Sequence, residues 1–127
     1  MYLLDTTFLI DCLDSKDKFL NELIELSVSP LFVSVISIAE LFSNTSENQI
    51  DKIKNFLESF TILPLTQEIA IKAGLTRAEL TKCGYKKLLP DILIGQTAIE
   101  HNLILVTGNP KDFPQLRARK QLMPFPD

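Results

Sequence analysis

Four acidic residues, spread along the chain, stand where folded proteins often build reactive sites. Asp5 lies in "LLDTTFLID", directly after a short apolar run, and Glu40 lies in "VISIAELF". Asp91 follows a proline in "PDILIGQTAIEHN", and Asp112 belongs to "TGNPKDF", which follows another apolar run. Carboxylates within a few ångströms of one another raise each other's pKa, and a divalent cation relieves the repulsion. Mg²⁺ accepts such oxygen ligands together with water and phosphate, and it activates water for phosphodiester hydrolysis.

Each acid also has a purely structural interpretation. Asp5 could cap the N-terminus of a following helix. Ser37 and Glu40 have the S-x-x-E spacing of a capping box. The dipole of the next helix would favour a negative charge at Asp91, and Asp112 could stabilise a turn. Only a common location in the fold would separate the metal-site interpretation from these local ones.

The hydrophobic pattern indicates which elements would position the acids. We expect short buried strands over residues 2–4, 31–35, 61–64 and 103–106. We expect helices over residues 6–13, 18–28, 37–44, 46–60, 67–81 and 90–101. Strands separated by helices predict an α/β fold with a parallel sheet covered on both faces. Reactive groups collect at the carboxyl edge of such a sheet. Asp5 and Asp112 would follow strands there, and Glu40 and Asp91 would open helices.

Composition limits the class of protein. The chain has 127 residues, 46% of them hydrophobic, which suits a single domain spanning 1–127 with a real core. Cys12 and Cys83 are too few and too distant to suggest a disulfide framework. We find no leader-like N-terminus and no apolar run near the about 20 residues that cross a bilayer. We therefore expect a soluble cytoplasmic protein with reduced thiols and no membrane partner.

Charge argues against nucleic-acid binding by overall positive potential. The formal net charge is −3 and the pI is near 5.1, so any nucleic acid would be held locally. Small basic clusters include Lys86 and Lys87, and another lies around Arg117. Such clusters are more often solvated faces, and these three side chains are therefore secondary candidates for contact with nucleic acid.

Together, the segments "LLDTTFLID", "SVISIAELF" and "LPDILIGQTAIEHNLILVTGNPKDF" resemble the PIN-domain ribonucleases, most closely the VapC-type toxins of toxin–antitoxin pairs. The resemblance covers nearly the whole chain. It implies a PIN-like three-layer sandwich, in which a small parallel sheet is flanked by helices. It also implies that Asp5, Glu40 and Asp91 form the core of a Mg²⁺ or Mn²⁺ site.

The fourth position of the implied site has two candidates. Family members place an acid either two residues after the threonine of the last motif, which is Asn109 here, or just before the phenylalanine, which is Asp112. We expect Asp112 to be the fourth acid and Asn109 to be a neutral ligand or to orient water. Thr6 matches the hydroxyl of the first motif, and Thr107 would support the last loop.

The resemblance implies an activity and partners. We expect an endoribonuclease in which a metal-activated water cuts RNA, leaving 5′-phosphate and 3′-hydroxyl ends. Relatives form homodimers and larger assemblies with a VapB-type antitoxin, whose C-terminal segment covers the site. The number of ions and the RNA that is cut stay open.

The ribonuclease function has two alternatives. One is a PIN fold that serves only as a protein-binding scaffold. The other is a phosphoacceptor receiver module, whose paired acids and distal lysine this chain lacks.

Overall fold

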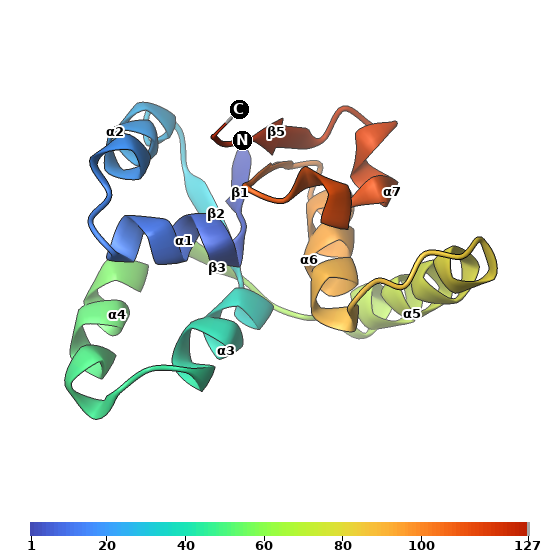
Figure 1. Ribbon diagram of the computed structural model, residues 1–127, viewed down its shortest axis with the longest axis horizontal. Helices are drawn as coiled ribbons and strands as arrows, with labels where there is room; N and C mark the ends of the chain where they lie inside the picture. Colours follow the sequence, from blue (N-terminus) through green and yellow to red (C-terminus); the bar gives the residue numbers. More distant parts are fainter. Residues whose placement is uncertain (127) are drawn as a thin grey trace.

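The computed structural model describes residues 1–126, and Asp127, the last residue of the predicted domain, lies outside them. One parallel sheet, in the order β3-β2-β1-β4-β5, runs through the centre (Figure 1). Its strands are β1 (Tyr2–Leu4), β2 (Leu31–Ser34), β3 (Thr61–Leu63), β4 (Ile104–Thr107) and β5 (Leu122–Pro124). The described helices are α1 (Thr6–Leu13), α2 (Asp17–Leu26), α3 (Val35–Ser43), α4 (Ile50–Leu57), α5 (Gln67–Lys82), α6 (Leu89–Glu100) and α7 (Pro114–Arg117), with 3₁₀ turns η1 (Glu47–Gln49) and η2 (Pro110–Asp112).

The sheet is buried on both faces, as its apolar strands predict. Adjacent strand residues point to opposite faces. Leu4 and Val106 belong to a core that also contains buried residues of α1, α2 and α4. Leu3 and Leu105 belong to a second core with Ile94 of α6 and Leu116 of α7. Figure 1 shows α1, α2 and α4 on one side and α5, α6 and α7 on the other. The predicted α/β sandwich is confirmed.

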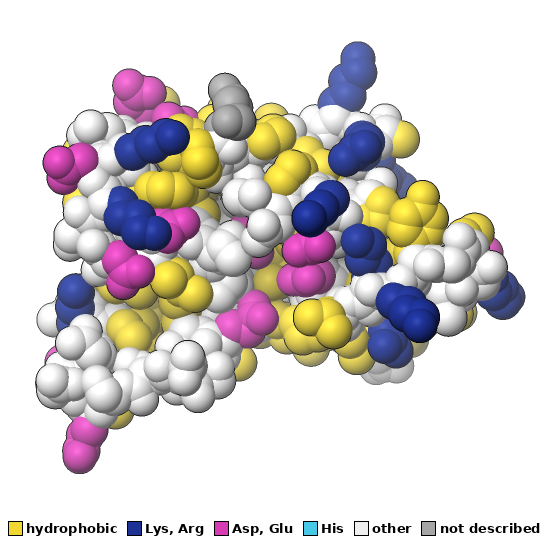
Figure 2. Space-filling view, in the orientation of Figure 1, with side chains coloured by type: hydrophobic (Ala, Val, Ile, Leu, Met, Phe, Trp, Pro, Cys, Tyr) yellow, Lys and Arg dark blue, Asp and Glu magenta, His cyan; other side chains and the backbone are white. Residues whose placement is uncertain are grey.

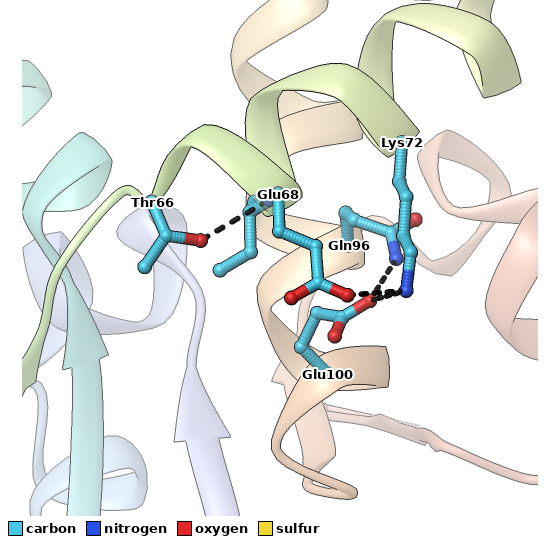
Figure 3. A network of polar contacts seen from close by, with 6 residues as sticks. Thr66, Glu68, Lys72, Gln96 and Glu100 are labelled. Atoms are coloured by element: carbon cyan, nitrogen blue, oxygen red, sulfur yellow. Dashed lines mark hydrogen bonds and ion pairs between the residues drawn. The ribbon is translucent and has the colours of Figure 1, made fainter.

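Polar contacts tie α5 to α6, the helix that carries Asp91. The Thr66 hydroxyl caps α5 by accepting a hydrogen bond from the amide three residues later. The Lys72 ammonium lies 3.0 Å from Glu68 and 2.9 Å from Glu100, and the Gln96 amide donates to Glu100 (Figure 3). Because Lys72 and Glu68 are exposed to solvent, these ion pairs contribute little to the free energy of unfolding.

The expected strands and helices are present, with ends that differ by a few residues. The helix expected over 46–60 begins as η1 and ends at Leu57. The strand expected over 31–35 ends at Ser34, whose hydroxyl accepts a hydrogen bond from the Ile36 amide and caps α3. The sequence did not predict η2, α7 or β5. Each is short and contains a proline, so no uninterrupted apolar run or helical spacing marks it in the sequence.

The proposed capping box at Ser37 and Glu40 is wrong. Both residues lie inside α3, which begins at Val35. Glu40 therefore does not open a helix, although Asp91 does, standing in the first turn of α6. An i, i+3 pair shares one face of a helix wherever the helix begins, so the spacing alone did not identify a cap.

The two cysteines lie in different environments, Cys12 buried and Cys83 exposed. Cys12 and Cys83 are both free thiols. Burial raises the pKa of Cys12 to about 12, so this thiol stays protonated and unreactive at neutral pH.

Within residues 1–126, no helix combines the length and apolarity that crossing a bilayer would require.

Candidate active site

The four acids singled out from the sequence line one pocket. It has a volume of about 380 Å³ and lies at the carboxyl edge of the sheet, where α1, α3, α6 and the β4–η2 segment meet. Asp5, Glu40, Asp91 and Asp112 all contribute to its wall, together with Asn109. Figure 2 shows acidic side chains near the middle of this face, with Lys and Arg side chains gathered over the α5, α6 and α7 side. Residues far apart in sequence thus form one acidic pocket.

Asp5 is held rigidly at the base of the pocket. It directly follows β1, and its backbone amide donates to the Val106 carbonyl of β4 at 3.0 Å. One carboxylate oxygen accepts from the Thr6 amide at 2.8 Å. The other accepts from the Thr107 hydroxyl at 2.7 Å and from the Thr7 hydroxyl at 3.3 Å. The side-chain position is therefore set by two neighbouring strands and the start of α1.

The proton affinity of Asp5 reflects this buried environment. The residue is only 4% exposed. Burial raises the pKa of Asp5 above its ordinary value, the hydrogen bond from Thr107 opposes that rise, and repulsion from Glu40 adds to it. A buried carboxylate near a second one is the arrangement that a bound cation stabilises.

Glu40 is tied to α1 across the pocket. The Thr6 hydroxyl donates to its carboxylate at 2.6 Å. The same hydroxyl oxygen lies 2.8 Å from Ser37 Oγ, and Ser37 is completely buried. Thr6 thus links the first acidic segment to the second. Ser37 acts in this tertiary contact and not as a cap.

Asp91 enters the pocket from the N-terminal turn of α6. Among the described residues, its carboxylate accepts no hydrogen bond, in contrast to that of Asp5. Burial, followed by repulsion from Asp5, Asp112 and Glu40, raises the pKa of Asp91 to about 6, and Lys87 partly offsets this rise. Burial is the largest cause of this rise, and repulsion from the other three carboxylates adds to it.

Asp112 and Asn109 come from the segment that follows β4. The Thr107 hydroxyl accepts a hydrogen bond from the backbone amide of Asn109 at 3.0 Å. The backbone amide of Asp112 donates to the backbone carbonyl of Asn109 at 3.0 Å. Thr107 therefore holds both Asp5 and the start of the loop that carries Asp112. Both candidates for the fourth group line the pocket.

The three basic candidates differ in their environment. Lys86 and Arg117 are exposed, and neither lines the acidic pocket. Lys87 is turned inward with a 19% exposed side chain, and its ammonium lies 4.0 Å from Asp112. It also donates to the Lys111 carbonyl at 2.9 Å. Lys87 thus ties the segment before α6 to η2, a contact that its position in the sequence did not reveal.

The donor set suits a hard divalent cation. Within residues 1–126, no three Asp, Glu, His or Cys side chains are grouped tightly enough to hold a metal ion as they stand. The carboxylates that share this pocket would have to rotate toward an ion or reach it through water. Mg²⁺ commonly binds one or two carboxylates and keeps several waters, and carboxylate oxygens also suit Mn²⁺. The raised pKa values of Asp5 and Asp91 give the physical reason for a cation here.

The fold and this pocket define a class of protein. The chain matches the PIN domain over residues 2–118 and belongs to the PIN domain family. Among curated proteins it is similar to ribonuclease VapC2 of Haemophilus influenzae, with 31% identity over 122 residues and 92% of each chain covered. It is also similar to the tRNA(fMet)-specific endonuclease VapC of Salmonella typhimurium, with 27% identity over 120 residues and 91% of each chain covered.

Solved structures show the same fold in toxin–antitoxin complexes. The chain is similar to one in VapBC2 from Rickettsia felis bound to a promoter DNA fragment, with a TM-score of 0.81, 27% identity, and 96% of this chain and 95% of that chain covered. It is also similar to one in a toxin–antitoxin complex from Klebsiella pneumoniae, with a TM-score of 0.77, 28% identity, and 97% and 96% covered. VapC nucleases with PIN domains are in general metal-dependent.

Further residues line the acidic pocket that the sequence did not single out as site residues. They include Ile10, Ser43 and Asn44. Asn44 follows Glu40 by four residues at the end of α3, and this spacing places both on one face of a helix. That signal was available in the sequence, but it identifies a pocket residue only once Glu40 itself is known to face the pocket.

Proposed function

We propose that this protein is a metal-dependent endoribonuclease and the toxin of a type II toxin–antitoxin pair. The observation that carries the proposal is the convergence of Asp5, Glu40, Asp91 and Asp112 on one pocket of a PIN domain. The ribonuclease names of its relatives support the activity. The toxin–antitoxin complexes among similar structures support the biological role. A single PIN domain over 1–127 and a cytoplasmic location, where RNA is found, belong to the same proposal.

The four carboxylates would hold Mg²⁺ or Mn²⁺, with Asn109 as a neutral ligand or a group that orients water. Bound there, the ion supplies an activated water and neutralises charge on the phosphate. Thr107 and Thr6 keep Asp5 and Glu40 in place through the hydrogen bonds described above. Since water and not the ribose 2′-hydroxyl is the nucleophile, the products would carry 5′-phosphate and 3′-hydroxyl ends.

Contact with RNA beyond the reacting phosphate would be local. Lys86 and Arg117 are exposed and would contact the RNA backbone. Lys87 would act nearer the pocket, because its ammonium already lies beside Asp112. A few lysine and arginine contacts to phosphates suffice for local, salt-dependent binding.

A protein partner is also part of the proposal. Several large apolar side chains stand exposed on α5 and the segment after it, among them Ile71, Leu75 and Leu88. Exposed apolar surface of this kind is typical of protein–protein contacts. We expect a homodimer and a larger assembly with a VapB-type antitoxin, to be measured by light scattering after chromatography of the chain alone and co-expressed with the product of the adjacent gene.

Partner-free protein incubated with structured RNA at increasing Mg²⁺ concentration tests the activity. We expect metal-dependent cutting that Asp5→Asn abolishes. Asp51→Asn is the matched control, because Asp51 is an exposed acid on α4, outside the pocket. RNA binding without cutting would show a catalytically silent scaffold instead.

The strand order already separates this chain from the receiver module. The order here is β3-β2-β1-β4-β5, whereas the flavodoxin-like order of receiver domains is 2-1-3-4-5.

A further inference from the structure

A second cavity adjoins the acidic pocket. It has a volume of about 310 Å³ and lies between α1, the end of α3, and the η1–α4 segment. Ile10, Glu40 and Asn44 line both this cavity and the acidic pocket. The two hollows are therefore neighbours that share a wall. A ligand held at the carboxylates can extend into the second cavity without leaving the protein surface.

The wall of this cavity combines apolar and amide groups. Leu13, Leu41 and Ile53 line it from three different helices. Asn44 and Gln49 line it too, and among residues 1–126 neither side-chain amide has a hydrogen-bond partner. A side-chain amide offers two donors and an acceptor. The cavity thus presents aliphatic surface together with amide groups that can donate and accept.

We propose that this cavity binds one unpaired RNA base, that of a nucleotide beside the scissile phosphate. The inference rests on the proposed ribonuclease function, because the phosphate position is that of the four carboxylates. Proteins read single-stranded RNA by holding splayed bases against side chains and hydrogen-bonding to their edges. Asparagine and glutamine are well suited to such edge contacts. The volume lies at the lower end of the range for small-ligand pockets, which suits a base.

The polar groups favour a base over an apolar side chain of a protein partner. An aliphatic side chain in the cavity would cover Asn44 and Gln49 without satisfying their amides, and burying an unsatisfied polar group is costly. Asp14 also lines the cavity and can accept from the amino group of a base. Lys52 lines it as well, although its ammonium already donates to the Leu13 carbonyl at 3.1 Å.

Abasic substitution tests the inference. The cut site is first mapped by sequencing RNA ends, and short RNAs are then made with one abasic nucleotide at each position beside the cut. For the wild type, we expect loss of one particular base to lower kcat/KM by roughly 10-fold or more, the scale of one good base contact. Gln49→Ala should lower kcat/KM on intact RNA by a similar factor and have almost no effect on that abasic RNA.

Two further variants sharpen the comparison. Asn44→Ala should behave like Gln49→Ala at the same nucleotide position. Asn55→Ala is the matched control, because Asn55 is an exposed amide on α4 that lines neither cavity. For Asn55→Ala, the ratio of kcat/KM on intact RNA to kcat/KM on abasic RNA should equal the wild-type ratio.

Several results would overturn the inference. One is equal cutting of every abasic RNA by the wild type. Another is the same loss for Gln49→Ala on intact and abasic RNA, which would indicate a general structural defect. A third is unchanged cutting by Gln49→Ala combined with weaker binding of a protein partner, which would show that the cavity seats that partner.

Failure of the proposed function is recognised separately. In that case the wild type cuts no RNA at any Mg²⁺ concentration. Base binding by the cavity is then tested by measuring the equilibrium affinity of the protein for homopolymeric oligoribonucleotides and for an abasic strand of equal length. Equal affinities for the intact and abasic strands would overturn base binding, whereas a preference for bases that Gln49→Ala removes would support it.

Discussion

Replacing Asp91 by asparagine should stabilise the metal-free protein at neutral pH while it removes the proposed activity. Burial and the charges of Asp5, Asp112 and Glu40 raise the pKa of Asp91 from its ordinary 3.8 to about 6. The folded state therefore binds this proton more tightly than the unfolded state does. The free energy of unfolding must fall as the pH rises through the window between these two values. Asparagine carries no charge and escapes this penalty.

The expected gain follows from the size of the pKa shift. One pKa unit corresponds to about 1.4 kcal/mol, so the full shift would amount to about 3 kcal/mol at pH 7. Asp91 is only partly buried, and solvent screening reduces this to about 1–2 kcal/mol. Removing a negative charge from the first turn of α6 costs about 0.3–1 kcal/mol. Burial and repulsion together outweigh the dipole effect, and the middle of each range leaves a net gain of about 1 kcal/mol for Asp91→Asn.

Urea denaturation in EDTA, at pH values from 4 to 8, measures the gain. Asp51→Asn is the control for the dipole effect, because Asp51 is an exposed acid in the first turn of α4. Adding Mg²⁺ should stabilise the wild type by linkage and affect Asp91→Asn much less. A difference between wild type and Asp91→Asn that does not change with pH would refute the electrostatic reasoning, as would a less stable Asp91→Asn at pH 7.

Three further changes test individual contacts. Thr107→Val removes a 2.7 Å hydrogen bond to Asp5, and it should lower Mg²⁺ affinity, measured by calorimetry, by roughly 10-fold or more; unchanged affinity would show that the contact does not position the carboxylate. Lys87→Gln removes the cation that lowers the pKa of Asp91, so the acid limb of the pH–activity profile should move to higher pH, and it should stay in place in Lys87→Arg. Thr66→Ala removes the N-cap of α5 and should reduce the free energy of unfolding by about 1 kcal/mol; no change in urea denaturation would mean that this helix end unfolds independently.

The layered α/β architecture was predictable because burial on both faces leaves a strong local signal. The apolar runs that became β1, β2, β3 and β4 are separated by segments at helical spacing. The C-terminal η2, α7 and β5 were not predictable in the same way. β5 forms because Leu122 and its neighbours pair in parallel with β4. This pairing joins segments that are distant along the chain, so the local sequence of β5 does not indicate it.

Ser37 shows why the candidate site needed the tertiary structure. Its spacing to Glu40 agrees with a capping box and equally with two residues on one face of a helix. The contact between Ser37 Oγ and Thr6 Oγ1, 31 positions away, exists only because α1 packs against α3. Lys87 is similar, since nothing local distinguishes its inward ammonium from the exposed Lys86.

The sequence by itself determined most of the elements, the apolar faces that must be buried, and the four candidate acids, of which Glu40 lies inside α3 and not at its start. Hydrophobic periodicity and chain direction are local properties, so they can be read along one segment at a time. The tertiary structure alone decided that these acids share one pocket and that a second cavity adjoins it. The order β2-β1-β4 sets Asp5 beside Thr107, and such proximity depends on which distant segments pair.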